Sequence, residues 1–539
     1  MFERVTRRSL LGAAVATTTG LAVGCRTEDA GGGGAEGGGE GDQLVYPQHI
    51  AYDGPQPDLA GDTETGVPDG YLSYPDPPVS TGRVPLDLSA PVELFVQGTA
   101  TATAMDRNQW WQKVNADLGT EISLTAVDST QYLQKFQTSV AGEALGDLTQ
   151  IVVVPQLPKL LDKLFTDLTE HLSGDAVANY PNLANIPPAA WQVTTFDGKI
   201  WGVPQARVPA GRVMLTRGDV FEARGIELIP DLADGEAFLD LCREVHDPDN
   251  DLFAFGQLPN DWTVPEILES LGAPNGWSVD DAGNWTNAYE TPEYERALEI
   301  VAGMFGEGLY HPNSFSDPAS SHTWFDAGVT AMLSQDFANW QSKAQVLDTP
   351  VGALVMPQWD GGGTAAKHLG APAYTAPVGL SKIDDADRID ELLTVLDYIA
   401  SPFGSQEYLT VNFGIEGRQW DLKDGDIMLD PDRPDEAIRG LNYAGSAIWR
   451  DIYTPGRPEL TEMIHQYCAE QIPAGIADPS RGKYSETAVT KAPTETRKLG
   501  DLQGEIIQGR KPLSDWAPAV QQWRDGVGSK IADEYAAQG

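Results

Sequence analysis

TFDGKIWGVPQAR, residues 195–207, has the pattern of a hairpin that ends where the chain passes from one lobe to another. Asp197 and Gly198 form a dipeptide typical of tight turns, and residues 200–203 form a short apolar strand behind it. An ordinary surface hairpin would have the same local pattern. The assignment of a passage between lobes therefore depends on the rest of the chain.

Four residues at the end of this stretch predict a polar site. Gly202 allows another backbone to approach closely, and Pro204 is expected to end the strand pairing because it has no N–H group. Gln205 and Arg207 follow at the point where the chain leaves the first lobe. We expect their side chains to face a cleft and bind a ligand there.

Strands and helices alternate in the chain before this stretch. The apolar patterns predict strands at 92–96, 121–127 and 148–154 and helices at 105–118 and 130–140. Such alternation predicts a parallel, doubly wound sheet with helices on both faces. Ligands bind beyond the carboxyl ends of the strands in sheets of this kind.

Three candidate ligand-binding residues lie near helix starts in this arrangement. Asp128 is in the loop after the second strand, and Trp110 and Trp111 begin the first helix. Neighbouring helix positions lie about 100° apart, so we expect one tryptophan in the core and Trp111 at the cleft. Trp262, at the start of a later helix, is a further aromatic candidate.

Four segments match signatures of one protein family. They are DGKIWGVP at 197–204 (D-G-K-x-Y-G-x-P), Phe325, Gly328, Ala331 and Met332 (F-x-x-G-x-x-A-M), FGIEGRQW at 413–420 and EIIQGRKPLS at 505–514. With these segments the chain resembles the family 1 extracellular solute-binding proteins, the sugar-capturing lipoproteins of ABC importers, and in particular the maltodextrin-binding type. The resemblance covers about residues 91–535.

The resemblance implies an α/β fold of the two-lobed, periplasmic-binding-protein-like type II class. Each lobe would hold a mixed, mainly parallel sheet flanked by helices, and a hinge would join the lobes. Residues 91–206 and about 374–440 would form the first lobe. Residues 207–373 and about 441–539, with the C-terminal helices, would form the second.

The resemblance also implies candidate ligand residues. Trp340 would stack on a sugar ring after a strand of the second lobe, although a place in the lobe core is the alternative. Tyr374 would face the cleft beside the hinge. Glu416 and Arg418 would contact the ligand or pair with each other.

The implied function is the substrate-binding component of an ABC importer. Such a protein binds a sugar or oligosaccharide between its lobes and delivers it to the permease, with no catalysis, cofactor or metal, and we expect a monomer. Two alternatives are a lipid-anchored enzyme that degrades polysaccharides and a sugar-binding sensor without a transport role.

The N-terminal residues predict export and a lipid anchor. TRRSLL at 6–11 has the twin-arginine form, and the apolar run at 10–23 is shorter than the roughly 20 residues that span a bilayer. The run ends at LAVGC, which resembles a lipobox with Cys25 as the lipidated residue. We therefore expect a signal peptide at 1–24 and an extracytoplasmic protein anchored to the cell membrane.

Two further segments follow the lipidation site. Residues 25–45 form a glycine-rich tether. Residues 46–90 are rich in proline and glycine and predict an extended strap against the first lobe.

Composition excludes several function classes. The formal charge of −43 disfavours nucleic acid and anionic membrane surfaces as partners. Cys242 and Cys468 are expected to be two buried thiols, although a disulfide between them stays open. Residues 247–251 have acidic spacing like that of a calcium loop, but a leucine stands where that loop needs glycine, so a solvated turn is the preferred interpretation. No motif for nucleophilic, zinc or phosphate chemistry is present.

Overall fold

The computed structural model describes residues 44–80, 83–99, 101–430, 432–438 and 440–538. The predicted signal peptide, the lipidation residue Cys25 and the tether up to residue 43 lie outside these described residues. No described helix is both long enough and apolar enough to span a bilayer.

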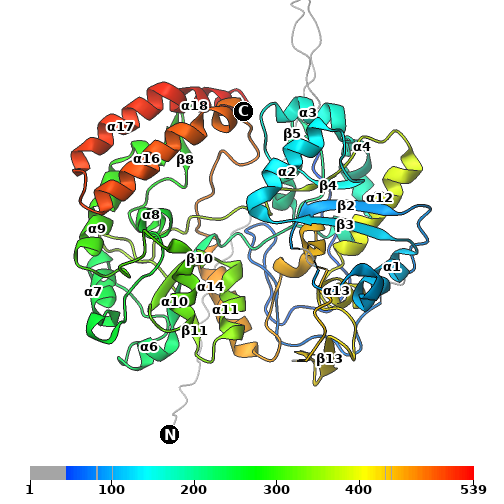
Figure 1. Ribbon diagram of the computed structural model, residues 1–539, viewed down its shortest axis with the longest axis horizontal. Coiled ribbons are helices and arrows are strands. Elements are labelled where there is room, and N and C mark those ends of the chain that lie inside the picture. Colours follow the sequence, from blue (N-terminus) through cyan, green and yellow to red (C-terminus); the bar gives the residue numbers. More distant parts are fainter. Residues whose placement is uncertain (1–43, 81–82, 100, 431, 439, 539) are drawn as a thin grey trace, which may run out of the picture. The chain divides into compact units, whose positions relative to one another are not determined.

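The first sheet combines three strands from the N-terminal part of the described chain with one strand from much later in the chain (Figure 1). Its strands are β2 (Val92–Gln97), β3 (Ile122–Val127), β4 (Leu148–Gln150) and β12 (Val378–Leu380), and helices α1 (Gln109–Leu118) and α2 (Ser129–Ala141) connect the first three. β2 pairs in parallel with β3 and β4, and β12 pairs antiparallel with β4. This confirms the predicted alternation of strands and helices. β4 is shorter than predicted because Ile151 N donates to Pro377 O, 2.7 Å away, and Pro377 has no N–H with which to return the bond.

The second sheet differs from the prediction of a mainly parallel sheet. Its strands are β7 (Arg212–Arg217), β10 (Met332–Asp336) and β11 (Val351–Leu354), and α11 (Ala338–Val346) connects β10 to β11. β7 lies between the other two and is antiparallel to both. The prediction was wrong because the chain runs along β7 in the direction opposite to that along β10. The first residue of β7, Arg212, therefore pairs with the last residue of β10, Asp336.

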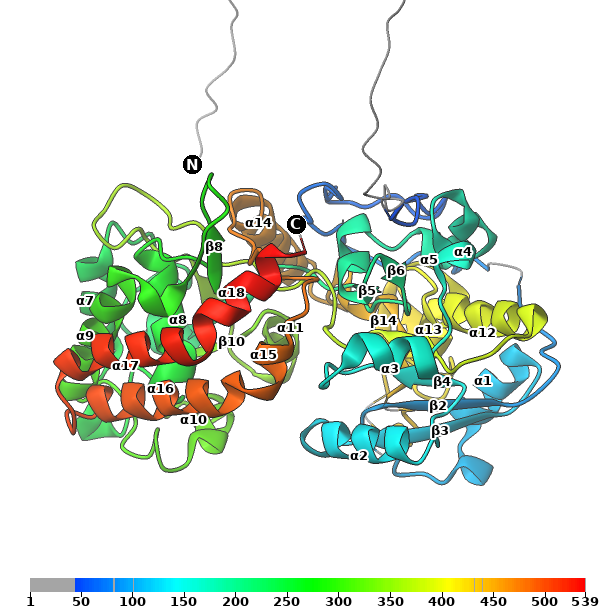
Figure 2. The same ribbon diagram turned by 90° about the horizontal axis from the view of Figure 1, so that it is seen from above.

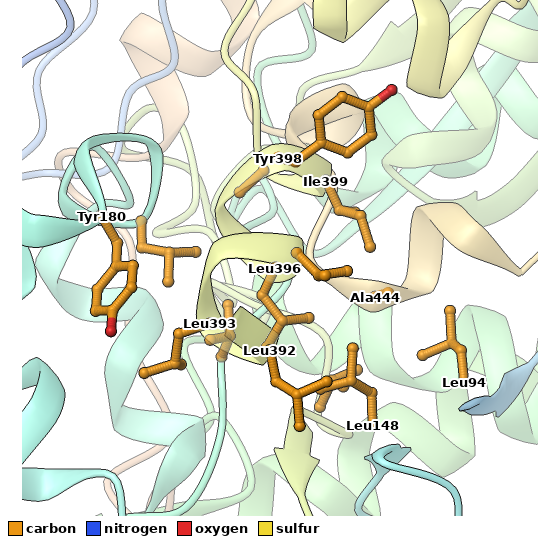
Figure 3. Close-up of a cluster of buried hydrophobic side chains, with 14 of the residues drawn as sticks. Leu94, Leu148, Tyr180, Leu392, Leu393, Leu396, Tyr398, Ile399 and Ala444 are labelled. Carbon is orange, nitrogen blue, oxygen red and sulfur yellow. The ribbon is translucent and has the colours of Figure 1, made fainter. Parts of the chain in front are cut away.

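The hydrophobic core is divided between the two sheets. One large cluster draws on residues 92–206 and 373–444. In it the leucines of α12 (Ala386–Ile399) face Leu94 and Leu148 of the first sheet (Figure 3). Two clusters around the second sheet draw on residues 210–365 and 452–531. The predicted limits of the lobes stay predictions.

The other helices group with one sheet or the other. Those packed in the clusters of the first sheet are α3 (Leu157–Leu164), α4 (Thr169–Leu172), α5 (Pro181–Ala184) and α13 (Gln406–Asn412). Those packed in the clusters of the second sheet are α6 (Gly218–Glu222), α7 (Gly235–Val245), α8 (Pro259–Ser270), α9 (Pro292–Gly306), α10 (Ser321–Asp326), α14 (Pro458–Gln471), α15 (Glu486–Thr490), α16 (Ala492–Ile507), α17 (Trp516–Trp523) and α18 (Ser529–Ala536).

Two hairpins project from these helical regions. They are β8 (Trp277–Val279) with β9 (Trp285–Asn287), and β13 (Trp420–Lys423) with β14 (Asp426–Leu429). The C-terminal helices α16, α17 and α18 run beside α9 and the first of these hairpins (Figure 2).

The strap, residues 46–90, contacts both parts of the core and not only the first as predicted. Gln48 N donates to Gly174 O, and Arg83 pairs with Asp397 at 2.5 Å, both on the side of the first sheet. Between these anchors, β1 (Gly70–Tyr71) pairs in parallel with β15 (Ile452–Tyr453), and Val67 is buried in a cluster of the second sheet. The strap has these anchors because its few apolar residues alternate between the two cores.

Candidate ligand-binding site

The hairpin of residues 195–200 forms as the sequence predicts. β5 (Thr195–Phe196) pairs with β6 (Lys199–Ile200), and Asp197 and Gly198 both have positive φ, 51° and 71°. Two positive φ values in a two-residue loop define a type I′ turn, which matches the twist of paired strands. The turn thus fixes the direction in which the chain leaves β6.

Residues 203–208 then form the first crossing from the first sheet to the second. They pair with residues 372–378, the second crossing, and the two segments form a ribbon. Val203 pairs with Val378 and Ala206 with Ala373, both antiparallel. A Cβ at Gly202 would lie 2.7 Å from Val378 O, so the predicted close approach is real. Pro204 does not end the pairing, because the ribbon continues past it to the hydrogen bond from Arg207 N to Pro372 O.

A third crossing, residues 442–449, lies beside this ribbon. Val208 N donates to Trp449 O at 3.2 Å, and the Gln205 side-chain amide donates to Asn442 O. The three crossings bring together six side chains, which we call the crossing cluster: Gln97, Gln205, Arg207, Tyr374, Tyr443 and Trp449.

Arg207 is held in the crossing cluster by aromatic rings. Its guanidinium carbon lies 4.5 Å from the ring centre of Tyr374 and 5.0 Å from that of Trp449. Such cation–π contacts are worth about 0.5 to 2 kcal/mol, depending on burial. Burial lowers the pKa of Arg207, and the buried Nε has no hydrogen-bond partner.

Tyr374 joins the ribbon to the first sheet. Its hydroxyl donates to Gln97 Oε1, 2.8 Å away, at the carboxyl end of β2, and its ring lies 5.5 Å from that of Tyr443. Burial raises the pKa of Tyr374, so the hydroxyl stays protonated and able to donate. Tyr374 therefore lies on the ribbon next to Arg207, and its predicted place at a cleft beside the hinge stays a prediction.

Trp262 lies on the side of the second sheet, in the first turn of α8. It is partly exposed, and the guanidinium carbon of Arg212 lies 5.7 Å from its ring centre. Arg212 pairs in register with Asp336, the exposed last residue of β10. Asp336 is close enough to Arg207 to raise its pKa by charge attraction, so this edge of the second sheet lies near the crossing cluster.

A cavity of about 1270 Å³ lies along the crossings. Its lining comes from the strap, the hairpin region, the three crossings and the segment before α15: residues 46–71, 185–198, 207–209, 369–372, 402–403, 450–451 and 477–483. Of the nine predicted ligand residues, Arg207 alone is among these lining residues. The sequence analysis missed the strap as part of a cavity, because nothing in its composition indicates what it covers.

Two predicted cleft tryptophans are core residues instead. Trp340 is 0% exposed, and its indole N–H donates to Val351 O at 2.8 Å. It lies on α11 and not in a loop after the strand, because α11 begins at Ala338, directly after β10 ends at Asp336. Trp111 is 3% exposed and donates to Ile122 O at 2.9 Å. Its neighbour Trp110 is also buried, because α13 covers that face of α1.

The other four predicted residues have different surroundings. Gln205 is 1% exposed and does not face open space, and its Oε1 has no hydrogen-bond partner. Asp128 is exposed at the carboxyl end of β3 and accepts hydrogen bonds from Thr130, which lower its pKa. Arg418 pairs with Glu436 at 2.5 Å and not with Glu416, which is exposed. This excludes one of the two expected alternatives, the pairing of Glu416 with Arg418, and the other, a ligand contact of these residues, stays a prediction.

Cys242 and Cys468 are free, buried thiols in two different clusters. This confirms the preferred expectation. In residues 247–251, Asn250 donates to Asp247 and Asp247 N donates to Leu252 O. Among the described residues, no three His, Cys, Asp or Glu side chains lie close enough together to hold a metal ion.

A buried charged cluster supports the start of the second crossing. The ammonium of Lys367, 2% exposed, lies 3.1 Å from Glu269 and 4.0 Å from Glu266 on α8. Glu266 accepts from Ser334 of β10, and Glu269 accepts from His368 N. The cluster therefore connects α8 and β10 to residues 367–368, which lead into the second crossing.

We expect His368 to make stability depend on pH. Burial lowers its pKa to about 4, from 6.5 in the unfolded chain. Between these values the unfolded chain binds a proton that the folded chain does not, so stability falls as pH falls from 6.5 to 4. His368→Gln should reduce this loss by about 1 to 3 kcal/mol in urea titrations across that range. An identical pH dependence in the variant and the parent would contradict the assignment.

The sequence matches one protein family over more than half of its length. Residues 109–392 match the family described as bacterial extracellular solute-binding protein. The chain is also 21% identical over 445 residues to lipoprotein LipO of Bacillus subtilis strain 168, covering 77% of this chain and 85% of that protein. It is 20% identical over 455 residues to the polygalacturonan/rhamnogalacturonan-binding protein YtcQ of the same strain, with the same coverage.

The fold matches that of solved binding proteins. The N-glycan transport solute-binding protein NgtS of Streptococcus pneumoniae superposes with a TM-score of 0.62 at 14% identity, covering 84% of this chain and 98% of that chain. At this identity the likeness shows the fold alone. The fold of this chain is thus similar to that of this transport protein.

Proposed function

The chain belongs to the bacterial extracellular solute-binding proteins, and we propose that its solute is a sugar or oligosaccharide that it delivers to the permease of an ABC importer. Membership of this family makes it a binding protein and not an enzyme. The observation that carries the proposal is the crossing cluster, in which three aromatic rings and three polar side chains meet between the two sheets.

The crossing cluster has the chemistry that binds a sugar ring. A sugar has apolar C–H faces that pack on aromatic rings and a rim of hydroxyls that need hydrogen-bond partners. Tyr374, Tyr443 and Trp449 supply rings, and Gln97 and Arg207 supply polar groups beside them. Trp262 offers a further ring on the side of the second sheet. Two similar proteins are named for glycan ligands, which supports the same class of solute here.

We propose that ligand binding closes the two lobes about the crossings. The ligand would favour a closed arrangement that touches it from both sides, and the permease would recognise that arrangement. The proposed lobes are residues 91–206 with about 374–440, and 207–373 with about 441–539. We further propose twin-arginine export and a lipid anchor at Cys25, supported by the residues at 6–11 and 21–25 and by a similar protein named as a lipoprotein.

Thermal unfolding of residues 44–539 with a panel of neutral and acidic oligosaccharides tests this function. A ligand at a hundred times its Kd adds about 2.7 kcal/mol of stability, a shift of several degrees or less for a chain of this size. Trp262→Ala and Tyr374→Ala should each reduce the shift without lowering the Tm of the free protein by much, because both side chains are partly exposed. Asp501→Ala, at an exposed residue of α16 outside the crossing cluster, is the control and should leave the shift unchanged. A panel in which no glycan raises the Tm would refute a sugar ligand.

A further inference from the structure

Arg207 is a desolvated cation without an acidic partner. The chain has 79 acidic and 36 basic residues, so its arginines and lysines have carboxylates in excess. Yet partly buried Arg207 forms no ion pair in the described ranges, and Asp336 acts on it only as a nearby charge. Its contacts are the faces of Tyr374 and Trp449, which leave the edge of the guanidinium and its N–H groups unpaired by charge.

Three other basic residues with little exposure are paired. Arg450 lies 3.1 Å from Asp451, Lys367 lies 3.1 Å from Glu269, and Arg217 lies 2.8 Å from Asp219. Even partial removal of a charge from water is unfavourable unless an opposite charge compensates. The aromatic contacts of Arg207 return only part of this cost.

A second arginine without an ion pair in the described chain lines the same cavity. Arg481 donates to the backbone carbonyl of Leu369, and burial lowers its pKa as it does that of Arg207. The acids in the lining are largely occupied. Asp62, Asp69 and Asp478 accept backbone N–H groups of turns, and Asp451 pairs with Arg450.

We propose that the oligosaccharide carries a carboxylate and that Arg207 binds it. The proposal rests on the proposed sugar-binding function and names its substrate class, a glycan that contains uronate residues. A guanidinium offers two parallel N–H donors that match the two oxygens of a carboxylate. The rings of Tyr374 and Trp449 hold the guanidinium plane in place, so little conformational entropy is lost when the carboxylate arrives.

Calorimetry with paired probes tests this inference. The probes are trisaccharides of galacturonate, of mannuronate and of glucuronate, each beside the neutral trisaccharide made by reducing its carboxylates to alcohols. At least one acidic probe should bind about 10- to 100-fold more tightly than its neutral counterpart, the range expected for a charged hydrogen-bonded pair. Its affinity should also fall as salt is raised, whereas that of the neutral probe should not.

Substitution of Arg207 assigns the effect to this side chain. Arg207→Met should remove most of the preference for the acidic probe and change the neutral probe little, while Arg207→Lys should keep part of it. Arg497→Met, at an exposed residue of α16, is the matched control and should bind as the parent does. If Arg207→Met does not fold, the parent protein still tests the carboxylate preference, through its affinities for the paired probes and their dependence on salt.

The outcomes separate the two proposals. Neutral trisaccharides that bind as tightly as the acidic ones would overturn the carboxylate and leave sugar binding intact. Equal losses for both kinds of probe in Arg207→Met would also overturn it, because they would mean that Arg207 only supports the rings. Absence of binding by every probe of the panel, acidic or neutral, would instead reject the proposed function.

Discussion

Replacing Trp340 with alanine is expected to lower the free energy of unfolding by about 3 to 5 kcal/mol, the usual cost of removing a buried tryptophan. Trp340 is fully buried between β11 and α14, where its N–H donates to Val351 O and its ring meets the edge of Tyr467 at 5.3 Å. The substitution leaves a cavity and also a carbonyl without its donor. Urea denaturation of residues 44–539 measures the change.

Trp262→Ala is the matched control for this prediction. The same side chain is removed, but from a partly exposed position at the start of α8, so the loss should be about 1 kcal/mol or less. Ligand binding should show the opposite order, with the larger loss in Trp262→Ala. A Trp340→Ala protein as stable as its parent but unable to bind glycans would restore Trp340 as a ligand residue.

Replacing Lys367 with methionine is expected to cost about 3 to 5 kcal/mol, because it leaves Glu266 and Glu269 buried without a cation. Burial already raises the pKa of Glu269 to about 7. Without the ammonium it should rise further, so the folded variant keeps protons that the unfolded chain has lost. Its stability should therefore fall as pH rises above the unfolded value of 4.5.

The matched control is Lys498→Met, which removes a lysine from an exposed pair with Glu495 on α16. Its cost should be at most about 1 kcal/mol and nearly independent of pH. A second variant, Lys367→Met with Glu269→Gln, removes one unpaired charge and should regain part of the lost stability. Equal costs for the two lysine variants would show that the buried cluster contributes no more than a surface pair.

Local patterns in the sequence predicted the features that depend on neighbouring residues. The turn at Asp197 and Gly198 and the close approach at Gly202 follow from residues that tolerate these backbone geometries. The first sheet was predicted from the alternation of strands and helices, which depends on apolar patterns within each segment. The direction of β7 depends on where the chain enters the second sheet, which no local pattern records.

Residues of the candidate site were harder to predict, because the same side chain fits two environments. A tryptophan after a strand can stack on a sugar or fill the core, and Trp340 differs from Trp262 only in what packs over it. Gln205 and Arg207 are two residues apart on one ribbon, yet only Gln205 is fully buried. Tyr443 and Trp449 reach the cluster from more than 200 residues away in the chain, and their sequence context gives no sign of it.

The strap changes what must be expressed to obtain a stable protein. The family match begins at residue 109, and the resemblance begins near residue 91, so a shortened chain would naturally start there. Such a chain would lose the strand that pairs with β15, expose the pocket that holds Val67 and leave the buried carboxylate of Asp397 without Arg83. We therefore expect a stable fragment to begin no later than residue 44, well before the segment that matches the family.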